Sequence, residues 1–190
     1  MKKVYVFLAE GFEEVEALAP IDILRRAGIE VDTVSIAEDL YVVAAHGVAF
    51  MADTIFGLCD FDDADLLFLP GGMPGAANLL AHEGLRELLV KKSREGVALA
   101  AICAAPAVLG ELELLKGRRA TCYPGFEEHL KEADVDNTGF IVKDTDANDH
   151  VVITGCGPAA AFEMAFALVE QLLDKETADK VREGMMFGRS

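Results

Sequence analysis

The stretch "ALAAICAAPA" (residues 98–107) decides the fold, because an unbroken apolar run meets a cysteine and only small residues and one proline follow it. Continuously apolar runs of this length are typical of parallel strands buried on both faces. The small residues after Cys103 favour an immediate turn into a helix, as at the strand-to-helix elbow of many nucleophiles. We therefore expect Cys103 in such an elbow.

The rest of the chain alternates between short apolar runs and stretches with helical spacing. The other predicted strands are "KVYVFL" (Lys3–Leu8), "EVDTVSI" (Glu30–Ile36), "DLLFLP" (Asp65–Pro70) and "HVVITG" (His150–Gly155). The predicted helices are Glu14–Ala27, Gly84–Glu95, Ala104–Leu115 and Ala159–Asp174, the first three closed by Gly28, Gly96 and Gly117, with a terminal helix in "DKETADKVREGM". Weaker patterns at "YVVAAHGVAFMAD" and "FIVKD" (Phe140–Asp144) predict antiparallel excursions. The alternation predicts one domain, residues 1–190, of α/β class with a mostly parallel central sheet between helices.

Composition limits the classes of function. Of the 190 residues, 52% are hydrophobic, and the formal net charge is −16. This charge repels nucleic acids and anionic membranes, so neither is an expected partner. The sequence shows neither a membrane-length apolar run nor a signal peptide, and we expect a cytoplasmic protein. Its four cysteines lack the spacing of zinc ligands or of a disulfide framework, so no metal site is expected.

Three unusual loops follow predicted strands, at the edge of the sheet where α/β folds bind ligands. They are "AEGFEEVEA", "LPGGMPGAANL" and "AICAAPA". The helix dipole behind Cys103 favours the thiolate and predicts a lowered pKa for this thiol. The alternative is that Cys103 fills the core as a small apolar residue.

A carboxyl group and two backbone amides complete the predicted site. Glu13 and Glu14 fit the start of a helix, where carboxylates stabilise the dipole. Glu16 is expected to point into the cleft, protonated beside the thiol. The N–H groups of Gly72 and Ala104 are expected to bind an oxyanion, although the glycines would also fit a plain turn.

Four segments together resemble the ThiJ/PfpI superfamily, in the branch of the Parkinson-disease-associated deglycase and its bacterial relatives. They are "LAEGFEEVEALAPIDILRRAGIEV", "LPGGMPGAANL", "AAICAAPAVL" and "GPAAAFEMAFALVEQL". The resemblance runs almost end to end and implies a flavodoxin-like three-layer sandwich that forms a homodimer. It also implies that Cys103 is the reactive cysteine, that Glu16 hydrogen-bonds it, and that Gly72 and Ala104 supply the oxyanion donors.

The chain departs from this family pattern at two places near the expected site, Tyr123 and the segment of Cys156 and Ala159, whereas His46 occupies a position that is polar or basic in relatives. Tyr123 stands where many relatives have a histidine, so no general-base imidazole is expected there; its hydroxyl either orients substrate or is structural. Cys156 replaces an arginine that would contact an anion, and a second thiol near Cys103 would be able to resolve a sulfenate into a disulfide. His46 either borders the cleft or lies at the surface or a subunit contact.

The leading functional hypothesis is cofactor-free chemistry on 2-oxoaldehydes such as methylglyoxal, or on their early adducts. Cys103 would be the nucleophile and Glu16 the general acid and base, giving a glyoxalase or deglycase that protects against carbonyl and oxidative stress. A cysteine protease or an amidotransferase is not expected, because Ala104 follows the nucleophile and no H-x-E pair lies downstream. The alternatives are a redox sensor whose Cys103 is oxidised to sulfinate without a dedicated substrate, or a chaperone.

Overall fold

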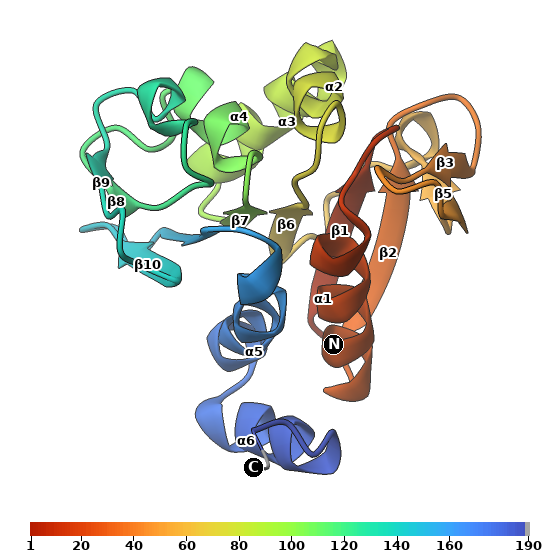
Figure 1. Cartoon of the computed structure of the whole chain (residues 1–190), viewed down its shortest axis with the longest axis vertical. Coiled ribbons are helices and arrows are strands. Elements are labelled where there is room, and N and C mark those ends of the chain that lie inside the picture. Colours follow the sequence, from red (N-terminus) through yellow and green to blue (C-terminus); the bar gives the residue numbers. More distant parts are fainter. Residues whose placement is uncertain (189–190) are drawn as a thin grey trace.

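The computed structural model describes residues 1–188 as a central β-sheet with helices on both faces (Figure 1). Within these residues the main sheet has seven strands, in the order β10 (Ile141–Thr145), β11 (Val151–Gly155), β7 (Ala98–Ile102), β6 (Leu66–Leu69), β1 (Lys3–Leu8), β2 (Glu30–Ser35) and β5 (Thr54–Ile55). All neighbouring pairs are parallel except β10 with β11. The predicted mostly parallel sheet is confirmed.

The helices form the two outer layers. They are α1 (Glu14–Arg26), α2 (Gly75–Ala81), α3 (Glu83–Arg94), α4 (Pro106–Glu111), α5 (Ala161–Leu172) and α6 (Lys175–Gly184). Alternate side chains of β1 separate two cores: Val4 and Val6 pack with α1 and α5, whereas Phe7 packs with α3 and α4. This period-two division is what a strand buried on both faces requires, and it makes the protein a three-layer sandwich.

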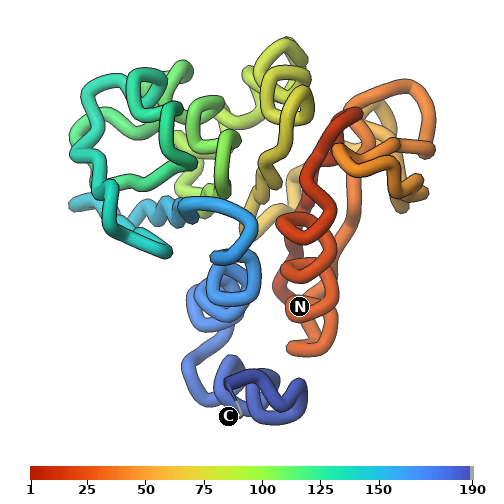
Figure 2. Tube along the Cα trace, in the orientation of Figure 1, coloured from red at the N-terminus to blue at the C-terminus, as the bar shows by residue number. Residues whose placement is uncertain are grey.

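Smaller elements lie at the two edges of the sheet. Strands β3 (Tyr41–Val43) and β4 (Ala49–Met51) form the antiparallel hairpin expected from the sequence, and β8 (Arg119–Ala120) pairs with β9 (Asp134–Val135). Single 3₁₀ turns occur at Phe56–Leu58, Glu127–His129 and Pro158–Ala160. Figure 2 shows that the hairpin region and the segment containing β8 and β9 lie on opposite sides of the molecule.

Two predicted boundaries are wrong. The helix expected over Ala104–Leu115 is α4, which ends at Glu111, because Glu113 takes a left-handed φ of 59° and its N–H bonds to the carbonyl of Gly110. Gly117, with φ of 70°, lies in a later turn that is closed by a bond from the N–H of Arg118 to the carbonyl of Leu115. The segment "LPGGMPGAANL" is not all loop, since α2 begins within it at Gly75. Residues 189–190, the end of the predicted domain, lie outside the described residues.

Candidate active site

The three loops meet at the carboxyl ends of β1, β6 and β7, and Gly71 shows how closely. A Cβ atom placed on Gly71 would lie 2.6 Å from Glu16 Oε2 and 2.7 Å from the Cβ of Cys103. Only a residue without a side chain fits between these two groups. Glu16 and Cys103 therefore flank the Gly71 backbone from two sides, as the predicted site requires.

Cys103 directly follows β7 and takes a left-handed backbone conformation, with φ of 64°. A non-glycine residue in this region is uncommon and is characteristic of a strained nucleophile elbow. Its backbone is fixed on both sides, since its N–H donates to the carbonyl of Gly155 at 2.8 Å and its carbonyl accepts from the N–H of Tyr123 at 2.8 Å. The predicted elbow is present, and the side chain at its tip is only 9% exposed.

Glu16 is fully buried in the first turn of α1. Its Oε2 accepts a hydrogen bond of 2.9 Å from the N–H of Gly71. Within residues 1–188 its Oε1 is buried without a hydrogen-bond partner. Buried polar atoms of this kind are rare, and at a functional site they indicate a place where a ligand atom or a proton is exchanged.

The pKa of Glu16 agrees with the expectation from the sequence, whereas the pKa of Cys103 does not. Burial raises the pKa of Glu16 to about 7, against hydrogen bonds from the Cys103 thiol and the Gly71 N–H, as predicted. Burial also raises the pKa of Cys103 to about 12, and the charge of Glu16 and its hydrogen bond to the thiol act in the same direction. The prediction of a lowered thiol pKa is wrong for the resting pair, because short α4 does not offset desolvation beside a carboxylate. Near neutral pH the thiol is therefore protonated, and the Glu16 carboxyl lies close to the midpoint of its titration.

Gly72 and Ala104 both direct a backbone N–H group at the sulfur of Cys103, and their role as oxyanion donors stays a prediction. The N–H groups of both residues act on the Cys103 sulfur and lower its pKa. Gly72 has φ of +89°, and a Cβ on it would lie 2.6 Å from the carbonyl oxygen of Gly11. The glycine is therefore needed for this close approach. Gly71 was not predicted as a site residue, although its place in the "PGG" run was the available signal.

Tyr123 and Cys156 border the same site. Besides the bond from its N–H to Cys103, Tyr123 packs its ring against Gly157, where a Cβ would lie 3.1 Å from the tyrosine Cδ2. Tyr123 is 46% exposed. Burial raises the pKa of the Cys156 thiol, and so does the charge of Glu16. All four cysteines are free thiols.

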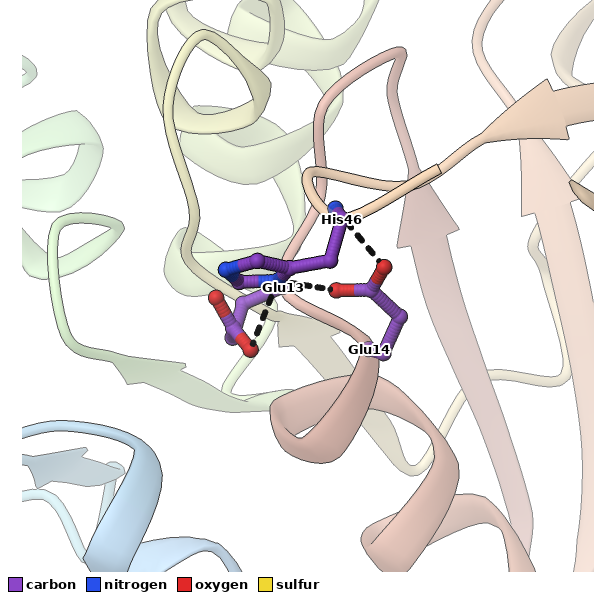
Figure 3. A group of neighbouring side chains, drawn as sticks. All are labelled: Glu13, Glu14 and His46. Carbon is purple, nitrogen blue, oxygen red and sulfur yellow. Dashed lines mark hydrogen bonds and ion pairs between the residues drawn. The ribbon is translucent and has the colours of Figure 1, made fainter. Parts of the chain in front are cut away.

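His46 lies in the β3–β4 hairpin and contacts two carboxylates at the start of α1 (Figure 3). Its Nδ1 lies 2.9 Å from Glu14 Oε2 and 3.6 Å from Glu13 Oε1. The hydrogen bond to Glu14 and the charges of both carboxylates raise the pKa of His46. Glu13 also donates its N–H to the carbonyl of Gly71 at 3.0 Å, so this cluster adjoins the site.

An apolar cavity lies beside the elbow. Its volume is about 220 Å³, and its lining includes Ala104 and Met73 together with side chains of Leu80, Val108 and Phe126. The cavity thus begins next to an expected oxyanion donor.

Within residues 1–188, none of the helices combines the length and apolar character that crossing a bilayer requires.

Comparisons with known proteins agree with this geometry. A family model described as the DJ-1/PfpI family matches residues 2–171. Protein DJ-1 homolog B of Arabidopsis thaliana is 40% identical over 183 residues, which are 95% of this chain and 40% of that protein, so the chain spans less than half of this relative. A protein named deglycase from Pyrococcus abyssi is 33% identical over 134 residues, 70% of this chain and 80% of that protein. The solved structure of oxidized Toxoplasma gondii DJ-1 superposes with a TM-score of 0.91 at 34% identity and covers 100% of both chains.

Proposed function

Because the chain belongs to the DJ-1/PfpI family, we propose that it is a cysteine-dependent enzyme that converts 2-oxoaldehydes such as methylglyoxal, free or as early adducts, into 2-hydroxy acids. The observation that carries this proposal is the buried pair of Cys103 and Glu16 around Gly71, with one glutamate oxygen left without a partner. A relative with the name deglycase supports the same class of chemistry. A cytoplasmic location, where thiols stay reduced, fits the four free cysteines.

The first step forms a bond between sulfur and the aldehyde carbon. The Cys103 thiol gives its proton to the Glu16 carboxylate, whose raised pKa of about 7 suits a general base at neutral pH. The sulfur adds to the aldehyde carbon, and the carbonyl electron pair moves onto oxygen. The N–H groups of Gly72 and Ala104 stabilise this oxyanion, and the proton on Glu16 then neutralises it to give a hemithioacetal.

The second step moves one proton between the two carbons and one between their oxygens. Ionised Glu16 removes the hydrogen from the former aldehyde carbon while the neighbouring carbonyl oxygen takes up a proton, which gives an enediol. The neighbouring carbon then takes up a proton, and the hydroxyl on the sulfur-bearing carbon gives one up. The product is a thioester of the 2-hydroxy acid on Cys103. Water hydrolyses the thioester, releases the acid and restores the thiol, so the sum is one 2-oxoaldehyde and one water to one 2-hydroxy acid. The apolar cavity beside Ala104 suits the substituent of the aldehyde or of its adduct.

The test is lactate formation from methylglyoxal by the purified protein without glutathione. We expect turnover by the wild type, and its loss in both Cys103→Ala and Glu16→Gln. In D₂O the lactate should carry deuterium at carbon 2 to the extent that the proton on Glu16 exchanges with solvent before it is returned to the enediol. Turnover that persists in Cys103→Ala contradicts the proposal. Adducts also decay spontaneously and reversibly to amine and free aldehyde. An added aldehyde trap makes this spontaneous decay irreversible and so gives its rate. A deglycase is inferred only if the protein releases amine from the adduct faster than the trap alone does.

A redox sensor is the second candidate, and one feature of the site favours it. The two N–H groups of Gly72 and Ala104, with the carboxyl of Glu16, would hold the oxygens of a sulfinate on Cys103. A similar protein, Toxoplasma gondii DJ-1, was solved in an oxidized form. Two equivalents of hydrogen peroxide per thiol would add two oxygen atoms to the sulfur and release two waters. Mass spectrometry after peroxide should find sulfinate at Cys103; a Cys103–Cys156 disulfide instead would identify Cys156 as a resolving thiol.

We also propose that the chain forms a homodimer through α1 and the β3–β4 hairpin. Large apolar side chains are exposed on both elements, namely Val15 and Leu18 on α1 and Tyr41, Val43, Val48 and Met51 in the hairpin region. Exposed apolar groups gathered in this way favour association. Light scattering should give twice the chain mass, and Met51→Glu should shift the protein toward monomer.

A further inference from the structure

The cluster of Glu13, Glu14 and His46 is not used by the chemistry proposed for Cys103. One donor atom from each residue, a histidine nitrogen and two carboxylate oxygens, lies within 4.8 Å of the other two (Figure 3). The measured separations from Nδ1 are 2.9 Å to Glu14 Oε2 and 3.6 Å to Glu13 Oε1. Around a tetrahedral zinc ion with bonds of about 2.0–2.1 Å, ligand atoms lie about 3.4 Å apart. The two separations from Nδ1 are therefore close to the spacing that zinc imposes, and the two carboxylate oxygens lie within 4.8 Å of each other.

Backbone hydrogen bonds hold the two elements of this cluster together. The hairpin is attached to the loop before α1 by bonds from the N–H of Gly11 to the carbonyl of Val43 and from the N–H of Ala45 to the carbonyl of Phe12. The second oxygen of Glu14, Oε1, accepts the N–H of His46 at 2.8 Å. This bond orients the Glu14 carboxylate so that Oε2 faces His46 Nδ1, at 2.9 Å. Such support of a ligand by a second hydrogen bond is typical of metal sites.

Burial and charge distinguish this cluster from ordinary surface acids. The side chains of Glu13 and Glu14 are 16% and 12% exposed, whereas His46 is 72% exposed. Among residues 1–188, His46 is the only partner in the ion pairs of these two glutamates. Two largely buried carboxylates thus face at most one positive charge. A divalent cation would balance both, and carboxylates with so little water around them gain more from it than exposed ones do.

We propose that Glu13, Glu14 and His46 form a zinc-binding site at the mouth of the Cys103 site. His46 Nδ1, Glu13 Oε1 and Glu14 Oε2 are the three protein ligands, and the exposed side of His46 leaves the fourth position to water. The imidazole binds in its neutral form, so a proton on Nδ1 leaves to solvent as the metal binds. The mixture of nitrogen and oxygen ligands suits zinc better than calcium or magnesium, which prefer oxygen alone. The site does not depend on the reaction proposed for Cys103.

Isothermal titration with zinc chloride tests this site, using wild type and three variants of the full chain. His46→Arg keeps a positive charge beside both carboxylates but removes the metal ligand. His129→Arg is the matched control, because His129 Nδ1 also lies 2.9 Å from a carboxylate, Glu111 Oε1, but that carboxylate already pairs with Lys131. Cys103→Ala removes the competing thiol. We expect one zinc per chain in wild type, in Cys103→Ala and in His129→Arg, and at least tenfold weaker binding in His46→Arg.

Cobalt spectroscopy gives a second readout of the ligands. Cobalt bound to wild type should show visible bands of a site with nitrogen and oxygen ligands and no sulfur-to-metal charge transfer, and Glu13→Gln should weaken its binding. Equal zinc affinity of wild type and His46→Arg overturns the proposal. Loss of the zinc in Cys103→Ala, or a sulfur charge-transfer band, also overturns it, because the ion would then be bound by the thiol.

Discussion

Replacing Gly71 by alanine tests the packing of the site with a single methyl group. The φ of Gly71 lies outside the left-handed range, so alanine fits the backbone itself and any effect comes from crowding. The new Cβ would lie 2.6 Å from Glu16 Oε2 and 2.7 Å from both the Cβ of Cys103 and the carbonyl oxygen of Ile102. Relief of such contacts requires shifts of about 1 Å, because carbon atoms pack at about 3.5–4.0 Å. Overpacking of this kind costs about 1–3 kcal/mol.

We expect two effects of Gly71→Ala. The Tm should fall by about 2–12 °C, from about 2–4 °C per kcal/mol for a chain of this size. The kcat/KM for methylglyoxal should fall about 100-fold, since a misplacement of about 1 Å in a catalytic pair has that effect. The fall in kcat/KM must be larger than the fraction of unfolded protein alone would cause. Circular dichroism at the assay temperature measures that fraction.

Gly57→Ala is the control for both measurements. Gly57 lies in the 3₁₀ turn Phe56–Leu58, and no atom lies within 4 Å of the position that its Cβ would take. This variant should match the wild type within about 0.5 kcal/mol. If Gly71→Ala retains wild-type kcat/KM and Tm, Glu16 and Cys103 do not flank Gly71 as described, and the geometry of the proposed site is wrong.

Three further predictions concern charge. Activity in buffer with EDTA should fall about tenfold per pH unit below about 7, because protonated Glu16 cannot accept the thiol proton; a flat profile down to pH 5 would contradict this role. The pKa of Glu16 is raised on folding, so the stability that this group contributes is present below its ordinary pKa and is lost as pH rises through about 7. Glu16→Gln escapes that loss and should gain up to about 3 kcal/mol in urea unfolding at pH 8 and much less at pH 5; an equal gain at both pH values would exclude this cause. Arg118→Gln should lower the free energy of unfolding by about 2 kcal/mol, because the mostly buried guanidinium binds Asp144, Asp146 and a backbone carbonyl. Arg119 is exposed, so Arg119→Gln should lower it by less than about 1 kcal/mol. Equal losses in urea unfolding of the two variants would refute the argument.

The sheet and the elbow that carries Cys103 were predictable because strong local signals determine them. Strands buried on both faces read as apolar runs, and an elbow after β7 needs the small residues that follow Cys103. The end of α4 was not predictable, because it depends on the left-handed turn at Glu113. The thiol pKa was not predictable either, since the balance between dipole and burial depends on how deeply the sulfur lies. The contact between His46 and Glu14 joins residues 32 positions apart, which no local pattern records.

The energetics of the site separate a functional cysteine from a structural one. A core free to optimise packing would place an apolar side chain at position 16, because a buried carboxyl with an unpartnered oxygen is destabilising. It would also avoid a non-glycine residue at φ of 64°, which costs about 1–2 kcal/mol. Both features occur in groups that touch Gly71, while the strands around them carry ordinary apolar cores. A left-handed φ alone does not mark a functional residue, because Phe61 and Glu113, outside the site, have φ of 59° as well; at Cys103 it coincides with the unpartnered carboxyl oxygen of Glu16. Their coincidence at one point supports the proposal that Cys103 and Glu16 act together in the proposed reaction.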